Sequence, residues 1–168
     1  MSKVAARDKL IKTRVAMLLK YPFWGPLAAR LKLEEAPWCR TIATDGRKFY
    51  YNSEFVNNLP LKQLEFLVGH EVLHAVYDHM GRRESRDPKL WNIADDYCVN
   101  SDLIEQRVGE RITVCGMLYD AKYKNMSAEE VYDDLMQNAD KINIEQLAQQ
   151  LLDEHLDGDE DDDGEGNT

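Results

Sequence analysis

Two histidines and one glutamate have the residue types and spacing for metal chemistry. His70, Glu71 and His74 form a His-Glu-x-x-His pattern. Residues four apart on an α-helix project from one face about one turn apart, so His70 and His74 can present two imidazoles to one metal ion. Zinc suits this pair because it binds neutral imidazole and accepts tetrahedral geometry. Glu71 lies beside that face, where its carboxylate can accept a proton from water. The pattern therefore predicts one Zn²⁺ ion, with Glu71 as the general base.

A catalytic zinc site normally has a third protein ligand and one open position. Residues 88–106 are predicted to form a helix, on which Asn92, Asp96 and Asn100 recur every fourth residue between apolar flanks. If this helix packs against the motif helix, Asp96 is the expected third ligand. Asp95 is the rival carboxylate, one residue away. Asn92 and Asn100 are expected to orient the ligands by hydrogen bonds, although surface amides are the simpler interpretation.

The other polar residues near the motif have weaker predicted roles. His79 lies nine residues after His70. On an unbroken helix that spacing places it on the opposite face, so it is expected to be a partly buried histidine outside the site. Asp78 could brace His74, but an exposed charge is the simpler expectation. Four tyrosines are candidates to stabilise an oxyanion, and nothing in the sequence separates them: Tyr77, Tyr97, Tyr119 and Tyr123.

The elements that must position these residues predict an α+β domain, mainly helical, over residues 1–156. Apolar periodicity and caps predict helices over residues 4–20, 27–33, 61–83, 88–106 and 143–156, and a further helix opened by a capping box at Ser127. A hairpin is expected over residues 40–52 around Asp45-Gly46, and a short strand at residues 112–114. The motif helix and the Asp96 helix should pack antiparallel.

Composition sets limits on the class of protein. The chain has 168 residues, of which 43% are hydrophobic and 31% are charged, which fits one globular domain. Its formal net charge is −10, but residues 157–168 hold seven acidic side chains and no basic one. This segment is predicted to be a disordered acidic tail. The sequence contains no basic patch of the kind that nucleic-acid-binding proteins use, so we do not expect the chain to bind nucleic acid.

Cysteine usage and hydropathy predict the location. Cys39, Cys98 and Cys115 show no CxxC spacing, which is typical of buried thiols in a reducing compartment. The sequence shows neither the pattern of a signal peptide nor an apolar run of the length that a membrane span needs. We therefore expect a soluble cytoplasmic protein with no membrane association.

Two runs of this sequence resemble a known family. Gly69 to His74, and Arg86 to Asn100, are similar to the putative metallopeptidase domain of bacteria and phages, as are the later runs 118–120 and 126–132. The resemblance covers roughly residues 10 to 137. It implies a zincin-like fold, with His70, His74 and Asp96 at the metal and Glu71 as the base.

The resemblance also implies partners. In that family a von Willebrand factor A-like domain typically follows, often beside a MoxR-type ATPase. Here an acidic segment stands where the A-like domain would begin, which indicates either a short form or part of a longer protein.

The leading functional prediction is hydrolysis of a peptide or amide bond in a peptide or protein substrate. The alternative is a catalytically inactive, metal-stabilised scaffold or interaction module working with a MoxR-type ATPase or von Willebrand factor A-like partner. A structural zinc site does not need Glu71 and prefers cysteine ligands, so the motif favours catalysis. A third hypothesis, that the acidic tail mimics nucleic acid or binds a basic partner, rests on the tail alone. A solubilising extension or linker is the simpler interpretation.

Overall fold

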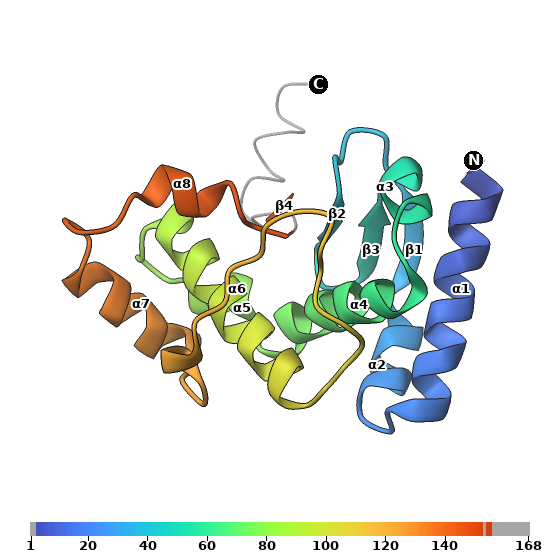
Figure 1. The fold of residues 1–168 in the computed structure, drawn as a ribbon, viewed down its shortest axis with the longest axis horizontal. Coiled ribbons are helices and arrows are strands. Elements are labelled where there is room, and N and C mark those ends of the chain that lie inside the picture. The colour runs from blue at the N-terminus through green and yellow to red at the C-terminus, as the bar shows by residue number, and fades with distance from the viewer. Residues whose placement is uncertain (1–2, 153, 156–168) are drawn as a thin grey trace.

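The computed structural model describes residues 3–152 and 154–155. It confirms the predicted mainly helical α+β class (Figure 1). The helices are α1 (Lys3–Lys20), α2 (Trp24–Arg30), α3 (Ser53–Asn57), α4 (Leu61–Val76), α5 (His79–Arg82), α6 (Pro88–Glu105), the 3₁₀ turn η1 (Ala121–Tyr123), α7 (Ala128–Gln137) and α8 (Ile144–Ala148). The strands are β1 (Lys32–Glu35), β2 (Ile42–Thr44), β3 (Lys48–Tyr51) and β4 (Glu154–His155). The predicted acidic tail and its boundary at residues 156–157 lie outside the described residues.

The four strands form one small sheet in the order β1-β3-β2-β4. β2 and β3 make the predicted antiparallel hairpin, with Ile42 opposite Tyr51. Asp45 closes the turn because its Oδ1 accepts hydrogen bonds from the backbone N–H groups of Arg47 and Lys48, each at 2.9 Å. β1 pairs parallel with β3, and β4 pairs parallel with β2. The chain therefore returns to the hairpin after more than 100 residues, which brings its last described residues beside β2 (Figure 1).

Two apolar clusters meet along α6. One cluster joins α1, α2, the sheet and α4, and it includes Val99 and Leu103 of α6. The other joins α6 to η1 and α7 and contains Trp91 and Ile93. Apolar side chains pack against α6 on both sides. The polar residues of α6 that face α4 therefore lie in the interior of the protein. Figure 1 shows α4 between the sheet and α6, so residues on these two helices can meet in the interior.

Local signals correctly located several helix ends. Asp87 caps α6, because its Oδ2 accepts a hydrogen bond from the backbone N–H of Leu90 at 2.9 Å. Ser127 and Glu130 form the reciprocal capping box that opens α7. These two caps set the register of the helix that carries Asp96 and of the helix that packs against it.

Other predicted elements were wrong. The helix predicted over residues 61–83 ends at Val76, and α5 follows only after a break. Residues 112–114 form no strand. Among the described residues of the range 143–156, only Ile144–Ala148 form the predicted α-helix. β1 occupies the end of the range predicted as a helix, because Lys32–Glu35 pair with β3 and so gain hydrogen bonds that local sequence does not indicate. α3, capped by Asn52, was not predicted.

Within the described part of the chain, no helix combines the length and apolar character needed to cross a membrane.

The crossing of α1 and α2 depends on a glycine. A Cβ atom on Gly25 would lie 2.6 Å from Leu18 Cα and 2.8 Å from Met17 O, both of them backbone atoms that cannot move independently. We predict that Gly25→Ala lowers the free energy of unfolding by about 1–3 kcal/mol, through overpacking that exceeds the gain in helix propensity. Urea denaturation measures this change.

Gly116→Ala is the matched control, because the nearest atom to its added Cβ is Gln150 Cγ at 3.3 Å, in a flexible side chain. Its stability should stay within about 0.5 kcal/mol of wild type. Equal stability of Gly25→Ala and Gly116→Ala would contradict the close-packed crossing.

Candidate metal centre

Three polar atoms from α4 and α6 meet in the interior of the protein. His70 Nε2 and His74 Nε2 lie 3.0 Å apart. Asp96 Oδ1 lies 3.3 Å from His70 Nε2 and 3.2 Å from His74 Nε2. The three residues are 0%, 6% and 0% exposed, respectively. The structure thus brings together the three residues that the sequence predicts as metal ligands.

The triangle formed by these atoms has the dimensions of a zinc site. With metal–ligand bonds of about 2.0–2.1 Å in tetrahedral geometry, ligand atoms lie about 3.3 Å apart, close to the separations of 3.0, 3.2 and 3.3 Å found here. The ring centroids lie 4.5 Å apart while the two Nε2 atoms lie 3.0 Å apart, so both rings turn this nitrogen towards the space between them. Two imidazoles and one carboxylate are a donor set that zinc accepts.

Asn100 determines the orientation of His70. Its Nδ2 donates a hydrogen bond to the carbonyl of Leu118 at 2.9 Å, so its Oδ1 is left to accept. That oxygen lies 2.9 Å from His70 Nδ1, which must therefore carry the proton. The lone pair of His70 is then on Nε2, the atom in the triangle. Asn100 thus makes the predicted hydrogen bond to His70, whereas the role of the half-buried Asn92 stays a prediction.

Asp96 is held by the last part of the described chain. Its Oδ2 accepts a hydrogen bond from the backbone N–H of Leu152 at 3.0 Å, which directs Oδ1 to the histidines. The rival carboxylate, Asp95, lies with His79 on the other side of His74, with its Oδ1 3.7 Å from His79 Nδ1. The geometry therefore favours Asp96 over Asp95 as the third ligand.

Glu71 lies next to the triangle and is fully buried. One of its carboxylate oxygens lies within 4.8 Å of a ring nitrogen of each motif histidine. Asp96 Oδ1 lies 3.3 Å from His70 Nε2 and 3.2 Å from His74 Nε2. This arrangement would allow Glu71 to act either as a ligand or as a base beside an ion held by the two histidines.

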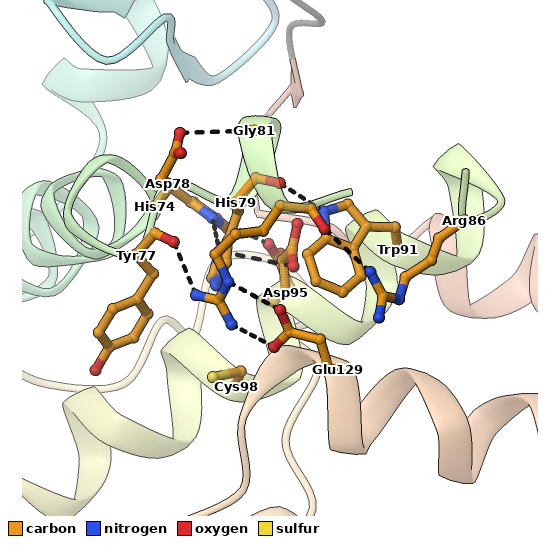
Figure 2. Close-up of polar contacts among 12 residues, drawn as sticks. His74, Tyr77, Asp78, His79, Gly81, Arg86, Trp91, Asp95, Cys98 and Glu129 are labelled. Atoms are coloured by element: carbon orange, nitrogen blue, oxygen red, sulfur yellow. Dashed lines mark hydrogen bonds and ion pairs between the residues drawn. The ribbon is translucent and has the colours of Figure 1, made fainter. Parts of the chain in front are cut away.

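The prediction that His79 lies away from the site was wrong. α4 ends at Val76, and Asp78 adopts the left-handed conformation, with φ of 51°. This turn brings His79 back towards α4, where its Nδ1 lies 3.0 Å from His74 Nδ1 (Figure 2). Asp78 does not brace an imidazole as the sequence allowed. Its exposed carboxylate caps α5 through the backbone N–H of Gly81. His79 itself is 2% exposed.

Arg82 fixes this break to the rest of the protein. Its Nη1 donates a hydrogen bond to the carbonyl of Tyr77 at 2.7 Å, and its guanidinium makes a two-pronged contact with the Glu129 carboxylate of α7. The hydrogen bonds from Arg82 hold the pKa of Glu129 below its usual value. The same pairing raises the pKa of Arg82. The turn that brings His79 into contact with His74 is therefore held in place by α7.

The candidate tyrosines are engaged in other contacts. Tyr77 donates a hydrogen bond to Asp102 Oδ2 at 2.7 Å, and Tyr123 donates one to Asp134 Oδ2 at 2.7 Å. The Tyr97 ring packs on Tyr123 with centroids 4.9 Å apart. Tyr119 lies under Arg111, whose Cζ is 4.8 Å from the ring centre. These contacts give no support for Tyr77 or Tyr123 as the oxyanion-stabilising group.

Cys98 is unsuited to nucleophilic chemistry. Burial, assisted by the nearby carboxylates of Asp102 and Asp95, raises the pKa of its thiol to about 12. The reactive form of cysteine is the thiolate, so Cys98 is inert near neutral pH.

Comparison with known proteins assigns the family. The model of the family described as "Putative metallopeptidase domain" matches residues 5–168. The chain belongs to this family. A Thermotoga maritima protein, described as uncharacterized, is 35% identical to this metallopeptidase-family chain over 57 residues, which are 33% of this chain and 14% of that protein. The match thus covers only a small part of that relative. No solved structure matches this chain.

The bridge between Arg82 and Glu129 predicts a pH-dependent stability. Since the pKa of Glu129 is below its ordinary 4.5 in the folded protein, its charge stabilises the fold above that pH. This contribution is lost as the pH falls through the folded pKa. We predict that Glu129→Gln lowers the free energy of unfolding by about 1 kcal/mol at pH 7. The difference from wild type should shrink below pH 4.5.

Denaturation at several pH values measures this effect, with Glu130→Gln as a control for charge on the same helix turn. A deficit in Glu129→Gln that is the same at neutral and acidic pH would contradict an ionic contribution.

Proposed function

We propose that this chain is a zinc-dependent peptidase that hydrolyses peptide or amide bonds, with His70, His74 and Asp96 as the metal ligands and Glu71 as the general base. The observation that carries the proposal is the triangle of His70 Nε2, His74 Nε2 and Asp96 Oδ1, with sides of 3.0 to 3.3 Å. Membership of the putative metallopeptidase family supports the same conclusion.

His70, His74 and Asp96 would hold the zinc ion, which when bound would supply the Lewis acidity for activating water and polarising a carbonyl group at neutral pH. Because only one ligand, Asp96, is anionic, the ligand set does not neutralise a divalent cation. Glu71 then accepts a proton from the attacking water and delivers it to the leaving nitrogen as the C–N bond breaks. Its burial beside the histidines keeps the proton transfer short and away from bulk water.

The alternative function is a metal-stabilised scaffold or interaction module. The observation in its favour is the burial of the site, since His70, Glu71, His74 and Asp96 are each at most 6% exposed. Against it, the proposed ligands include no cysteine, and a structural site does not need Glu71. The partnership with a von Willebrand factor A-like domain or a MoxR-type ATPase, and the cytoplasmic location, are further proposals. They rest on the family resemblance and on the cysteine usage.

Metal content tests the ligand assignment. We predict that purified wild type and Glu71→Gln each bind about one zinc ion per chain, whereas His74→Ala binds little. Glu71→Gln preserves the size of the side chain and removes only its capacity as a base. Elemental analysis after dialysis measures the zinc, and Asp133→Asn, a change at an exposed carboxylate of α7, is the control. A metal-free wild type whose melting temperature does not rise with added zinc would contradict the proposal.

Hydrolysis tests the role of Glu71. On any peptide substrate that zinc-loaded wild type cleaves, Glu71→Gln should reduce kcat by about 10²–10⁴-fold, the usual contribution of general acid–base catalysis. A mixed peptide library analysed by mass spectrometry provides the substrates. If zinc-loaded wild type and Glu71→Gln are equally inactive across the library, the scaffold alternative gains support.

A further inference from the structure

His74 is supported from behind by a second histidine. The Nδ1 atoms of His74 and His79 lie 3.0 Å apart, on the side of the His74 ring that faces away from Asp96. His79 cannot share the ion with His74 Nε2, because it approaches a different ring nitrogen. The contact between the two rings is therefore either a hydrogen bond or part of a second metal site. A second site is conceivable because His74, His79 and Asp95 each place a possible ligand atom within 4.8 Å of the others.

Ring geometry distinguishes these two possibilities. In both pairs of rings the facing nitrogens lie 3.0 Å apart. The ring centroids of His74 and His79 lie 5.2 Å apart, whereas those of His70 and His74 lie only 4.5 Å apart. When the distance between the ring centroids greatly exceeds the distance between the nitrogens, the two rings meet end to end, as a linear N–H···N hydrogen bond requires. The smaller excess for His70 and His74 means that their nitrogens do not point directly at each other, as two rings that share an ion require. His74 and His79 fit a hydrogen bond, and His70 and His74 fit a shared ion.

The direction of this hydrogen bond follows from the other side of the His74 ring. His74 Nε2 belongs to the triangle, so it must keep its lone pair for the metal. The proton of neutral His74 is then on Nδ1, which donates to His79 Nδ1. Metal-binding histidines generally donate their second N–H to an outer partner, which fixes the tautomer and the ring orientation. Asn100 is that partner for His70.

The position of His79 is itself fixed by contacts from α6. The Trp91 Nε1–H donates to the backbone carbonyl of His79 at 2.7 Å, and its ring packs edge-on against the imidazole, with centroids 6.0 Å apart. The left-handed turn at Asp78 sets the direction from which His79 enters. Figure 2 shows His79 between His74 and Trp91, with Asp95 beside it.

We propose that His79 is a positioning residue for the metal centre, accepting the Nδ1–H hydrogen bond of His74 and so presenting His74 Nε2 to the ion. This inference rests on the proposed zinc site. It assigns a role to a histidine that lies outside the His-Glu-x-x-His pattern and binds no metal itself.

The test compares zinc affinity in His79→Leu and His79→Asn. Leucine fills the buried space but cannot accept a hydrogen bond, whereas the amide oxygen of asparagine can lie near the place of Nδ1. We expect His79→Leu to weaken zinc binding about 10- to 100-fold in competition with a chromophoric chelator. His79→Asn should recover most of the affinity. The absorption spectrum of the cobalt-substituted protein should shift in His79→Leu and resemble wild type in His79→Asn.

The thermal stability of the metal-free variants shows whether packing alone was disturbed. If His79→Leu does not fold, the asparagine variant decides: retained affinity supports the hydrogen bond, and lost affinity overturns it. Wild-type affinity and spectrum in His79→Leu would overturn the positioning role while leaving the proposed function intact. Two zinc ions in wild type and one in His79→Leu would also overturn it, because His79 would then be a ligand. A wild type that binds no zinc would overturn both proposals.

Discussion

Two imidazoles and two carboxylates are buried together where α4 meets α6, between apolar clusters that exclude water. Burial of a carboxylate without a compensating positive charge is strongly unfavourable. The proposed ion would supply that charge to Asp96 and Glu71 at once. Metal binding in such a site contributes directly to folding, since the unfolded chain does not hold the ligands together. On this account the metal centre is both the chemical site and a part of the core.

The proposed ligands are held by contacts from different parts of the chain. Asn100 orients His70 from α6, the backbone of Leu152 orients Asp96, and His79 contacts His74 from α5. The Arg82–Glu129 bridge connects the α4–α5 turn to α7. These contacts link residues up to 56 positions apart. The geometry of the site therefore depends on the whole fold, although all three proposed ligands come from two helices.

Much of the site could be predicted from periodicity. A spacing of four residues places His70 and His74 on one face, and the same spacing along Asn92, Asp96 and Asn100 indicates the facing polar stripe. The position of His79 could not be predicted in this way. The helix break depends on Asp78 adopting a left-handed conformation, and neither glycine nor proline marks the break in the sequence.

The contact to Leu152 was also beyond sequence analysis, because a backbone N–H can bind a carboxylate whatever its side chain is. The β-sheet was only half predicted for a similar reason. The hairpin has a local turn signal at Asp45-Gly46, whereas β1 and β4 become strands by pairing with the hairpin edges.

The most direct test of the central claim is X-ray absorption spectroscopy at the zinc edge of the metal-loaded protein. The account predicts a first shell of nitrogen and oxygen atoms at about 2.0–2.1 Å, with the outer-shell scattering of two imidazoles and no sulfur. Loss of one imidazole contribution in His70→Ala would identify a ligand. A sulfur shell at about 2.3 Å, or fewer than two imidazoles in the wild-type protein, would contradict a site built from His70, His74 and Asp96.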